Sequence, residues 1–202
     1  TNEGCTFAIF GSQPLMLPRP LLRGAMQIGN AAGCVALLET LRAHWPRSPQ
    51  AYATGLRRAR IPGRLQRICE EPRITVDVAH NPQAAHALAD WLATQHGPVH
   101  AVFGLLDDKD LGGVLHPLLP HITHWHCVGL AQVSPRGRTA SGLQDALLSA
   151  RASVSAHPDV HSGLNAAIDA VPPDGQIIVF GSFLTVAGAL MACGMTAVPP
   201  LP

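Results

Sequence analysis

The chain has 202 residues and a formal net charge of +1, and only 13% of its residues are charged. This balance excludes the strongly basic surface with which proteins bind nucleic acid, and it leaves no run of like charges for an interaction tail. Hydrophobic residues make up 47%, which is enough for one large domain, or for one domain and a part of another.

Cysteine usage and hydropathy predict a reducing, cytoplasmic setting. The five cysteines are single and scattered, with no Cys-x-x-Cys pair, which argues against a disulfide framework and against a zinc ribbon. The longest apolar runs fall short of a membrane span, and no signal peptide opens the chain. Because the first residue is Thr1 rather than Met, we expect the chain to be a fragment or a processed form of a longer protein.

The first 60 residues predict a hairpin and two helices. Short apolar segments at 5–10 and 15–17 flank a Gly-Ser-Gln-Pro turn and predict a β-hairpin. Apolar residues at helical spacing within 24–41 predict a helix that begins near Asn30, a favourable N-cap residue. A second helix is predicted over 49–58, after a Ser cap.

From residue 65 onward the sequence alternates between strand and helix patterns. We expect strands at 65–69, 74–78, 99–105, 122–128 and 176–180, and helices at 82–95, 110–118, 141–151, 162–170 and 182–191. This alternation predicts an α/β fold with a Rossmann-like, mostly parallel sheet and helices on both faces. The Pro-Gly loop at 61–64 marks the domain boundary, so the sheet domain spans 61–194 and a disordered tail follows at 195–202.

Polar clusters lie beyond four of the predicted strands. They are Asp77-Val-Ala-His80-Asn81, Asp107-Asp-Lys109-Asp110, Ser134-Pro-Arg-Gly137 and Gly181-Ser182. In an open α/β sheet, ligands bind beyond the carboxyl ends of the strands. We therefore expect the four clusters to converge on one site.

The first cluster and a nearby Arg carry groups that suit a nucleotide or another anion. Asp77 could accept hydrogen bonds from a ribose diol or a metal-bound water, and His80 could donate to a phosphate or carboxylate, or titrate near neutral pH. The helix that starts at Pro82, with Asn81 as its cap, favours an anion at its N-terminus. The alternative is a plain helix cap beside a solvated His. Arg64 could clamp a phosphate or be an exposed loop residue.

The remaining clusters leave a similar choice open. Lys109 and Asp110 could position ATP, a metal or a substrate amine, or Asp110 could only cap the next helix. Ser182 caps a helix and could hydrogen-bond a carboxylate, but without a Gly-x-Ser-x-Gly elbow it is not expected to be a nucleophile. His124 and His126 share one face of a strand and could bind zinc or copper, although a His-rich strand edge without metal is favoured.

The common phosphate-binding loops are absent from the sequence. No Gly-x-x-x-x-Gly-Lys-Ser/Thr motif occurs, and no Gly-x-Gly-x-x-Gly follows the first strand. The sequence therefore predicts the partner half of a nucleotide enzyme whose phosphate loop lies elsewhere.

Six motifs stand in the order of a known family. They are Asn30-Ala-Ala, Pro62-Gly-Arg64, Asp77-Val-Ala-His80-Asn81-Pro82, Gly104-Leu-Leu-Asp-Asp-Lys109-Asp110, Ser134-Pro-Arg-Gly137 and Phe180-Gly-Ser182-Phe-Leu-Thr-Val186. Together they resemble the second half of the dihydrofolate synthase/folylpolyglutamate synthase family of the Mur ligase superfamily. The Asp-Val-Ala-His-Asn-Pro form favours the folate branch over the cell-wall branches.

The resemblance implies an ATP-dependent ligase. In that family ATP phosphorylates a carboxylate of dihydropteroate or of a folate, and the amine of L-glutamate attacks the acyl phosphate. The roles that the resemblance implies are ATP binding by Asn30, Arg64 and Asp77, substrate binding by His80 and Ser182, and catalysis by His80, Lys109 and Asp110.

The resemblance also implies which parts lie outside the chain. The P-loop, the Mg²⁺ ligands and the pterin site belong to an amino-terminal domain in that family. Residues 1–60 would be the end of this ATP-binding domain, and 61–194 would be the Mur ligase C-terminal domain. We therefore expect the chain to be inactive alone, with the missing P-loop domain as its partner. Two alternatives remain, another Mur-type amide ligase of cell-wall precursor synthesis and a non-catalytic α/β binding domain.

Overall fold

The computed structural model describes residues 4–7, 14–24, 26–45 and 48–195. The chain forms two compact units, Thr1–Ile61 and Pro62–Pro202. Within the described residues, no helix combines the length and the apolar character needed to cross a bilayer. The predicted disordered tail falls almost wholly on residues 196–202, which lie outside the described part of the chain.

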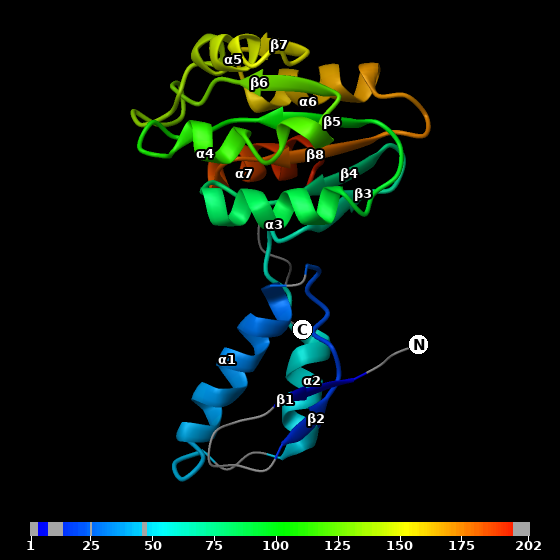
Figure 1. Ribbon diagram of the computed structural model, residues 1–202, viewed down its shortest axis with the longest axis vertical. Helices are drawn as coiled ribbons and strands as arrows, with labels where there is room; N and C mark the ends of the chain where they lie inside the picture. The colour runs from blue at the N-terminus through cyan, green and yellow to red at the C-terminus, as the bar shows by residue number, and fades with distance from the viewer. Residues whose placement is uncertain (1–3, 8–13, 25, 46–47, 196–202) are drawn as a thin grey trace. The chain divides into compact units, whose positions relative to one another are not determined.

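The first unit combines a two-stranded sheet with two helices (Figure 1). β1 (Cys5–Phe7) pairs antiparallel with β2 (Leu15–Leu17), which confirms the predicted hairpin, although residues 8–10 of its first strand lie outside the described residues. α1 (Met26–Thr40) and α2 (Pro49–Arg58) follow. Its core consists of Phe7, Leu17, Ala31, Val35 and Tyr52.

The predicted start of the first helix is wrong. α1 begins at Met26, so Asn30 lies inside the helix and is not its N-cap. The exposed Asn30 side chain donates to Oε1 of Gln27 at 3.2 Å. Met26 and Gln27 are good helix formers, which lets the helix extend past a residue that could have capped it. The Ser cap of α2 is confirmed, because the Ser48 side chain accepts a hydrogen bond from the Ala51 N–H.

The second unit is a six-stranded sheet, counted over the described residues, in the order β3-β4-β8-β5-β6-β7. The strands are β3 (Gln66–Cys69), β4 (Arg73–Val76), β5 (Val99–Phe103), β6 (His124–Val128), β7 (Val154–His157) and β8 (Gln176–Phe180). β3 runs antiparallel to β4, whereas every other neighbouring pair is parallel. This topology confirms the predicted Rossmann-like, mostly parallel sheet.

Helices cover both faces of this sheet (Figure 1). One face carries α3 (Pro82–Leu92), α4 (Leu111–Leu115) and α5 (Ala140–Ser149), the other carries α6 (Val160–Ala170) and α7 (Phe183–Ala192), and a short 3₁₀ turn, η1 (Leu119–His121), precedes β6. The central strands β5 and β8 are buried along their whole length, as expected when both faces are covered. On the α3 face the rings of Phe103, Trp125 and Phe180 pack together with centroids 5.0 to 6.0 Å apart.

Strand β7 is missing from the predicted elements. The segment has four residues, Val154 to His157, and none of them is fully buried. Two cycles of alternation at a sheet edge are too few to separate a strand from a loop by periodicity. The missed strand adds one strand at the edge of the sheet and leaves the fold class unchanged.

Strand order brings the site together. β4, β8 and β5 are neighbours and run parallel, so their carboxyl ends meet at one edge of the sheet. Asp77 follows β4, Gly104 follows β5 and Gly181 follows β8. The polar clusters that follow these strands therefore start side by side.

Candidate functional site

Asp77 is a buried carboxyl group that organises the loop opposite it. Its side chain is 7% exposed, Oδ1 accepts a hydrogen bond from the Ala79 N–H at 2.8 Å, and Oδ2 accepts one from the Leu65 N–H at 2.9 Å. Burial raises the pKa of Asp77, while these two hydrogen bonds and the charge of Arg64 act in the opposite direction. Both oxygens thus bind backbone, and the carboxyl group fixes the loop that carries Arg64.

That loop has an unusual backbone. Gly63 and Leu65 on either side of Arg64 have φ values of +72° and +41°, in the left-handed region. A Cβ at Gly63 would lie 2.7 Å from Cγ1 of Val78, whose N–H donates to the Gly63 carbonyl at 2.8 Å. The Asp77 contact holds Leu65 in a conformation that is uncommon for a branched side chain. Arg64 is therefore displayed on a constrained turn.

His80 lies at the N-terminus of α3. Its Nδ1 lies 2.8 Å from the Val78 carbonyl oxygen, and since a carbonyl only accepts, Nδ1 carries the proton of this bond. Asn81 caps α3 by accepting from the Ala84 N–H at 2.9 Å, and Pro82 is the first helical residue. The predicted cap is confirmed, and His80 is half-buried beside it.

Ser182 caps α7 and is tied to the end of β5. It is 3% exposed, and its Oγ accepts from the Thr185 N–H at 3.0 Å. The Thr185 hydroxyl lies 2.8 Å from the same Oγ and donates to the Gly104 carbonyl at 2.9 Å. The helix cap predicted for Ser182 is confirmed, and Thr185 is a site residue that the sequence did not single out.

Lys109 belongs to a group of three charges on two loops. Oδ2 of Asp108 lies 2.9 Å from the Lys109 Nζ and 2.7 Å from Nη2 of Arg136. The hydrogen bonds from Arg136 and Lys109 hold the pKa of Asp108 well below its ordinary range. Opposite charges on two loops that follow neighbouring strands were the only sequence signal for this link.

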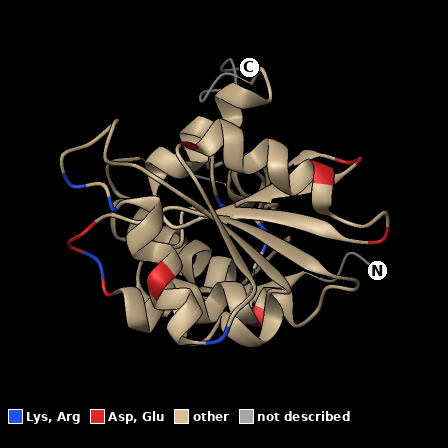
Figure 2. Ribbon diagram, turned by 90° about the horizontal axis from the view of Figure 1, so that it is seen from above, with Lys and Arg blue, Asp and Glu red and all other residues tan. Residues whose placement is uncertain are grey.

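Backbone contacts also join these two loops. Asp107 N–H donates to the Arg136 carbonyl at 2.8 Å, and Arg138 Nη2 donates to the Asp107 carbonyl at 2.9 Å. Asp110 caps α4 by accepting from the Gly113 N–H at 2.9 Å, which is the alternative role considered for it. Figure 2 shows basic and acidic residues mixed on loops at the left of the view, and further acidic residues on helices.

A cavity of about 210 Å³ lies where these elements meet. It is lined by His80, Leu106, Lys109, Gly181, Ser182, Phe183 and Leu184. The ring centroids of His80 and Phe183 are 6.1 Å apart, so the phenyl ring lies beside the imidazole. One imidazole, one ammonium group and one hydroxyl thus share a small space that suits a compact polar ligand.

The predicted site residues occupy four separate places. His80, Lys109 and Ser182 line the cavity together, whereas Asp77 and Arg64 form a separate pair on the neighbouring loops. Asp110 serves α4 as its cap and is not among the lining residues. Asn30 belongs to the other unit, and its adenine contact stays a prediction.

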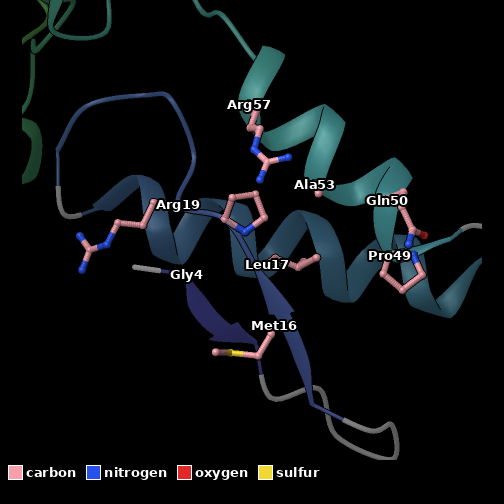
Figure 3. Close-up of a pocket in the computed structure, with 9 residues that line it drawn as sticks. Gly4, Met16, Leu17, Arg19, Pro49, Gln50, Ala53 and Arg57 are labelled. Carbon is pink, nitrogen blue, oxygen red and sulfur yellow. The ribbon is translucent and has the colours of Figure 1, made fainter. Parts of the chain in front are cut away.

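A larger cavity of about 370 Å³ lies in the first unit. Gly4, Met16, Leu17, Pro18, Arg19, Pro49, Gln50, Ala53 and Arg57 line it, and none of them is a predicted site residue. Among the described residues that line it, Arg19 and Arg57 are the charged ones, and Figure 3 shows these two side chains extending in different directions. The two cations do not converge on one ligand position, so we assign the candidate site to the smaller cavity.

Four histidines gather elsewhere on the sheet, under α6. His126 lies 3.2 Å from His157 and 3.3 Å from His100 between ring nitrogens, and the ring centroid of His124 lies 4.7 Å from that of His126. Burial lowers the pKa of all four, and that of His126 to about 3. Over the part of the chain that the structure describes, no group of three or more His, Cys, Asp or Glu is placed to hold a metal ion.

Curated relatives are folate enzymes longer than this chain. The Escherichia coli (strain K12) dihydrofolate synthase/folylpolyglutamate synthase is 37% identical over 142 residues, which are 69% of this chain and 32% of that protein. The Haemophilus influenzae protein of the same name is 33% identical over 182 residues, or 79% of this chain and 41% of that protein. The chain spans about a third to two fifths of the length of these relatives.

Solved structures and a family match agree with these relatives. A bifunctional folylpolyglutamate synthase/dihydrofolate synthase from Yersinia pestis, complexed with AMPPNP and Mn ion, aligns with a TM-score of 0.79 and 36% identity over 92% of this chain and 43% of that chain. A structure of that enzyme type with Mn, AMPPNP and L-glutamate bound gives 0.78 and 34%, with the same coverage. Residues 63–183 match the family described as "Mur ligase, glutamate ligase domain". The chain therefore belongs to the Mur ligase family and carries its glutamate ligase domain.

Proposed function

We propose that the chain is the carboxyl-terminal part of an ATP-dependent ligase that adds L-glutamate to dihydropteroate, to folate polyglutamates, or to both. The reaction proceeds through an acyl phosphate on the acceptor carboxylate. The observation that carries the proposal is the cavity lined by His80, Lys109 and Ser182 within the matched family region. The similarity to folate enzymes over most of the chain supports the choice of acceptor.

This chain would contribute to ATP binding through the positively charged side chain of Arg64. Arg64 sits on the turn that Asp77 fixes through Leu65, which suits an arginine that meets a phosphate. Asp77 has both oxygens bound to backbone, so we infer that it acts on the nucleotide chiefly by holding this turn. Asn30 remains the proposed adenine contact.

The described residues of this chain form no ready-made cluster of ligands for a divalent cation. They include no group of three or more His, Cys, Asp or Glu arranged to hold a metal ion. As the resemblance implies, the ligands of the Mg²⁺ that accompanies ATP are proposed to lie in the P-loop domain. The steps assigned to this chain involve only its own side chains.

In the proposed reaction the amine of L-glutamate attacks the carbonyl carbon of the acyl phosphate. The new C–N bond forms, the C–O bond to phosphate breaks, and the amine loses a proton. His80, with Nδ1 committed to the Val78 carbonyl, has Nε2 available to take that proton. Lys109 supplies the one cationic side chain of the cavity and would pair with a carboxylate or with the leaving phosphate.

Glutamate incorporation tests this proposal directly. The protein as encoded, with any residues that precede Thr1 in the reading frame, is incubated with ATP, radiolabelled L-glutamate and either dihydropteroate or a folate monoglutamate. We expect labelled product with at least one acceptor, and a loss of about 100-fold or more in kcat for His80→Ala. Arg64→Ala should raise the KM for ATP.

The matched control is His86→Ala, because His86 lies exposed on the same helix, α3. It should keep wild-type kinetics. Absence of product with both folate acceptors contradicts the proposal, and product with a cell-wall precursor instead would support the other Mur-type ligase. Wild-type kinetics in His80→Ala would contradict the assignment of the site.

A further inference from the structure

Thr185 is wholly buried, and its hydroxyl fixes the direction of two hydrogen bonds at the cavity. Its hydroxyl lies 2.9 Å from the Gly104 carbonyl oxygen and 2.8 Å from Oγ of Ser182. A carbonyl only accepts, so the single hydroxyl proton of Thr185 goes to Gly104. Ser182 must then donate its own proton to Thr185 Oγ1.

The opposite assignment leaves a buried polar group without a partner. If Thr185 donated to Ser182, two oxygen lone pairs would face each other at the Gly104 carbonyl, and that carbonyl would lose its side-chain donor. With its proton committed, Ser182 Oγ already accepts from the Thr185 N–H at 3.0 Å. One lone pair remains, so Ser182 can offer a ligand an acceptor and no donor.

Like Ser182, His80 offers a hydrogen-bond acceptor, but for a different reason. Its Nδ1 donates to the Val78 carbonyl at 2.8 Å, which leaves Nε2 with a lone pair in the neutral ring. His80 and Ser182 both line the cavity. The cavity therefore presents two hydrogen-bond acceptors from two different strand ends.

The remaining residues that line the cavity offer hydrogen-bond donors instead of acceptors. Lys109 brings an ammonium group, and the N–H groups of Phe183 and Leu184 stand in the first turn of α7, where a helix has no internal acceptor for them. This end of the cavity favours an anion. Acceptors beside an anion-binding end match the head group of an amino acid, which carries an ammonium and a carboxylate on one carbon.

We propose that the ammonium group of the amino-acid substrate docks between His80 and Ser182, and that Thr185 is the positioning residue that makes Ser182 an acceptor. The inference rests on the proposed function, since it concerns how the same site takes the incoming amino acid. It assigns Thr185 a role without contact to substrate. It also replaces the carboxylate contact considered for Ser182 with an amine contact.

Thr185→Val and Thr185→Ser test the role of the hydroxyl. In the valine variant the Ser182 proton is released and turns toward the cavity, where it meets the ammonium group. We expect the KM for L-glutamate to rise about tenfold, with kcat and the KM for ATP within about twofold of wild type. Thr185→Ser keeps the hydroxyl and should restore the KM for L-glutamate to within about twofold of wild type.

Thr123→Val is the matched control. Thr123 also donates its hydroxyl to a backbone carbonyl, that of Val99, at 2.8 Å, but it does so at the opposite end of the parallel strands. The Thr123→Val variant loses the same kind of hydrogen bond at a place away from the cavity, so it should keep wild-type kinetics. An unchanged KM for L-glutamate in Thr185→Val, or an equal rise in Thr185→Ser, overturns the proposal.

A titration that needs neither turnover nor a variant separates the two proposals. The ¹⁵N-labelled protein as encoded, with any residues that precede Thr1 in the reading frame, is titrated with L-glutamate, with glutarate, which lacks the amine, and with 4-aminobutyrate, which lacks the α-carboxylate. We expect L-glutamate to shift the amide signals of residues 181–185 with a Kd at least about tenfold lower than either analogue. Equal binding of glutarate overturns the amine contact, whereas absence of glutamate incorporation in the wild-type enzyme contradicts only the proposed function.

Discussion

Nδ1 of His126 lies 3.2 Å from Nε2 of His157, and the two rings stack with centroids 5.3 Å apart. On its other side, Nε2 of His126 lies 3.3 Å from Nδ1 of His100. Each neutral imidazole has one donor and one acceptor nitrogen, so the three rings can form a hydrogen-bonded chain across β5, β6 and β7. The arrangement satisfies buried polar groups only while these rings stay neutral.

We predict that this cluster makes stability depend on pH in the weakly acidic range. Burial and the neighbouring imidazoles lower the pKa of His126 from 6.5 to about 3. Between these values the unfolded chain binds the proton and the folded chain does not, so the contribution is complete above pH 6.5 and is lost as the pH falls toward 3. The free energy of unfolding should fall by about 2 kcal/mol for His126 alone between pH 7.5 and pH 5.

Urea unfolding between pH 7.5 and pH 5, in the presence of EDTA, checks this dependence. His126→Gln removes one titrating ring and should flatten the slope of stability against pH. His86→Gln changes an exposed histidine on α3 and should leave the slope unchanged. Asp159, which raises the pKa of His157, is the one charged group outside the four rings that shifts their pKa values among the described residues. Equal slopes for wild type and His126→Gln would rule out the role of the cluster.

The sequence predicted the strands of the sheet better than the side-chain contacts between residues of different strands. Continuous apolar runs such as Ile177 to Phe180 and bounding turns indicated the buried parallel strands, and polar residues at strand ends indicated where the cavity lies. The His cluster needed knowledge of strand order, because His100, His126 and His157 come from three strands. Only His126 and its neighbour His124 were recognised together, since they share one strand.

Local patterns also failed to separate site residues from residues that hold the site. The sequence pattern predicts that Asp77 contacts a ligand, yet both of its carboxylate oxygens accept hydrogen bonds from backbone N–H groups. Thr185 reads as an ordinary helical residue, since its role comes from Gly104, 81 positions earlier. Hydrogen-bond direction depends on such distant partners and leaves no trace in periodicity or spacing.

Asp77→Asn should destabilise the second unit by about 1–3 kcal/mol. An amide can accept at only one of its two atoms, so either the Leu65 N–H or the Ala79 N–H loses its acceptor. Urea unfolding at pH 7 measures the loss, and amide exchange should speed up at Leu65 or Ala79. Asp90→Asn, on the exposed face of α3, makes the same change without such contacts and should be close to neutral. A loss in Asp77→Asn no larger than in Asp90→Asn would show that the two bonds do not hold the loop.

Asp108→Asn should affect activity more than stability. Asp108 is exposed, so its ion pairs with Lys109 and Arg136 are screened by solvent, and the unfolding midpoint should hardly change. Lys109 loses the group that holds it at the cavity, so the KM for L-glutamate should rise about two- to tenfold. Arg136→Gln should add little to Asp108→Asn if both act through the same contact. Strictly additive effects of the two changes on KM would contradict this coupling.

Gly181→Ala should be the most damaging single-methyl change at the site. Gly181 has a φ of +110°, and a Cβ there would overlap the Gly104 carbonyl oxygen and lie 2.8 Å from the Phe103 ring. Backbone strain and overpacking together should cost about 2–5 kcal/mol, and Ser182 should leave its place at the cavity. Gly112→Ala in α4 is the matched control, because its Cβ would meet no described atom closer than 3.8 Å and helix propensity favours the change by about 1 kcal/mol. Thermal unfolding of both variants checks the contrast, and a Gly181→Ala chain as stable as Gly112→Ala would mean that the β8–α7 turn tolerates a side chain.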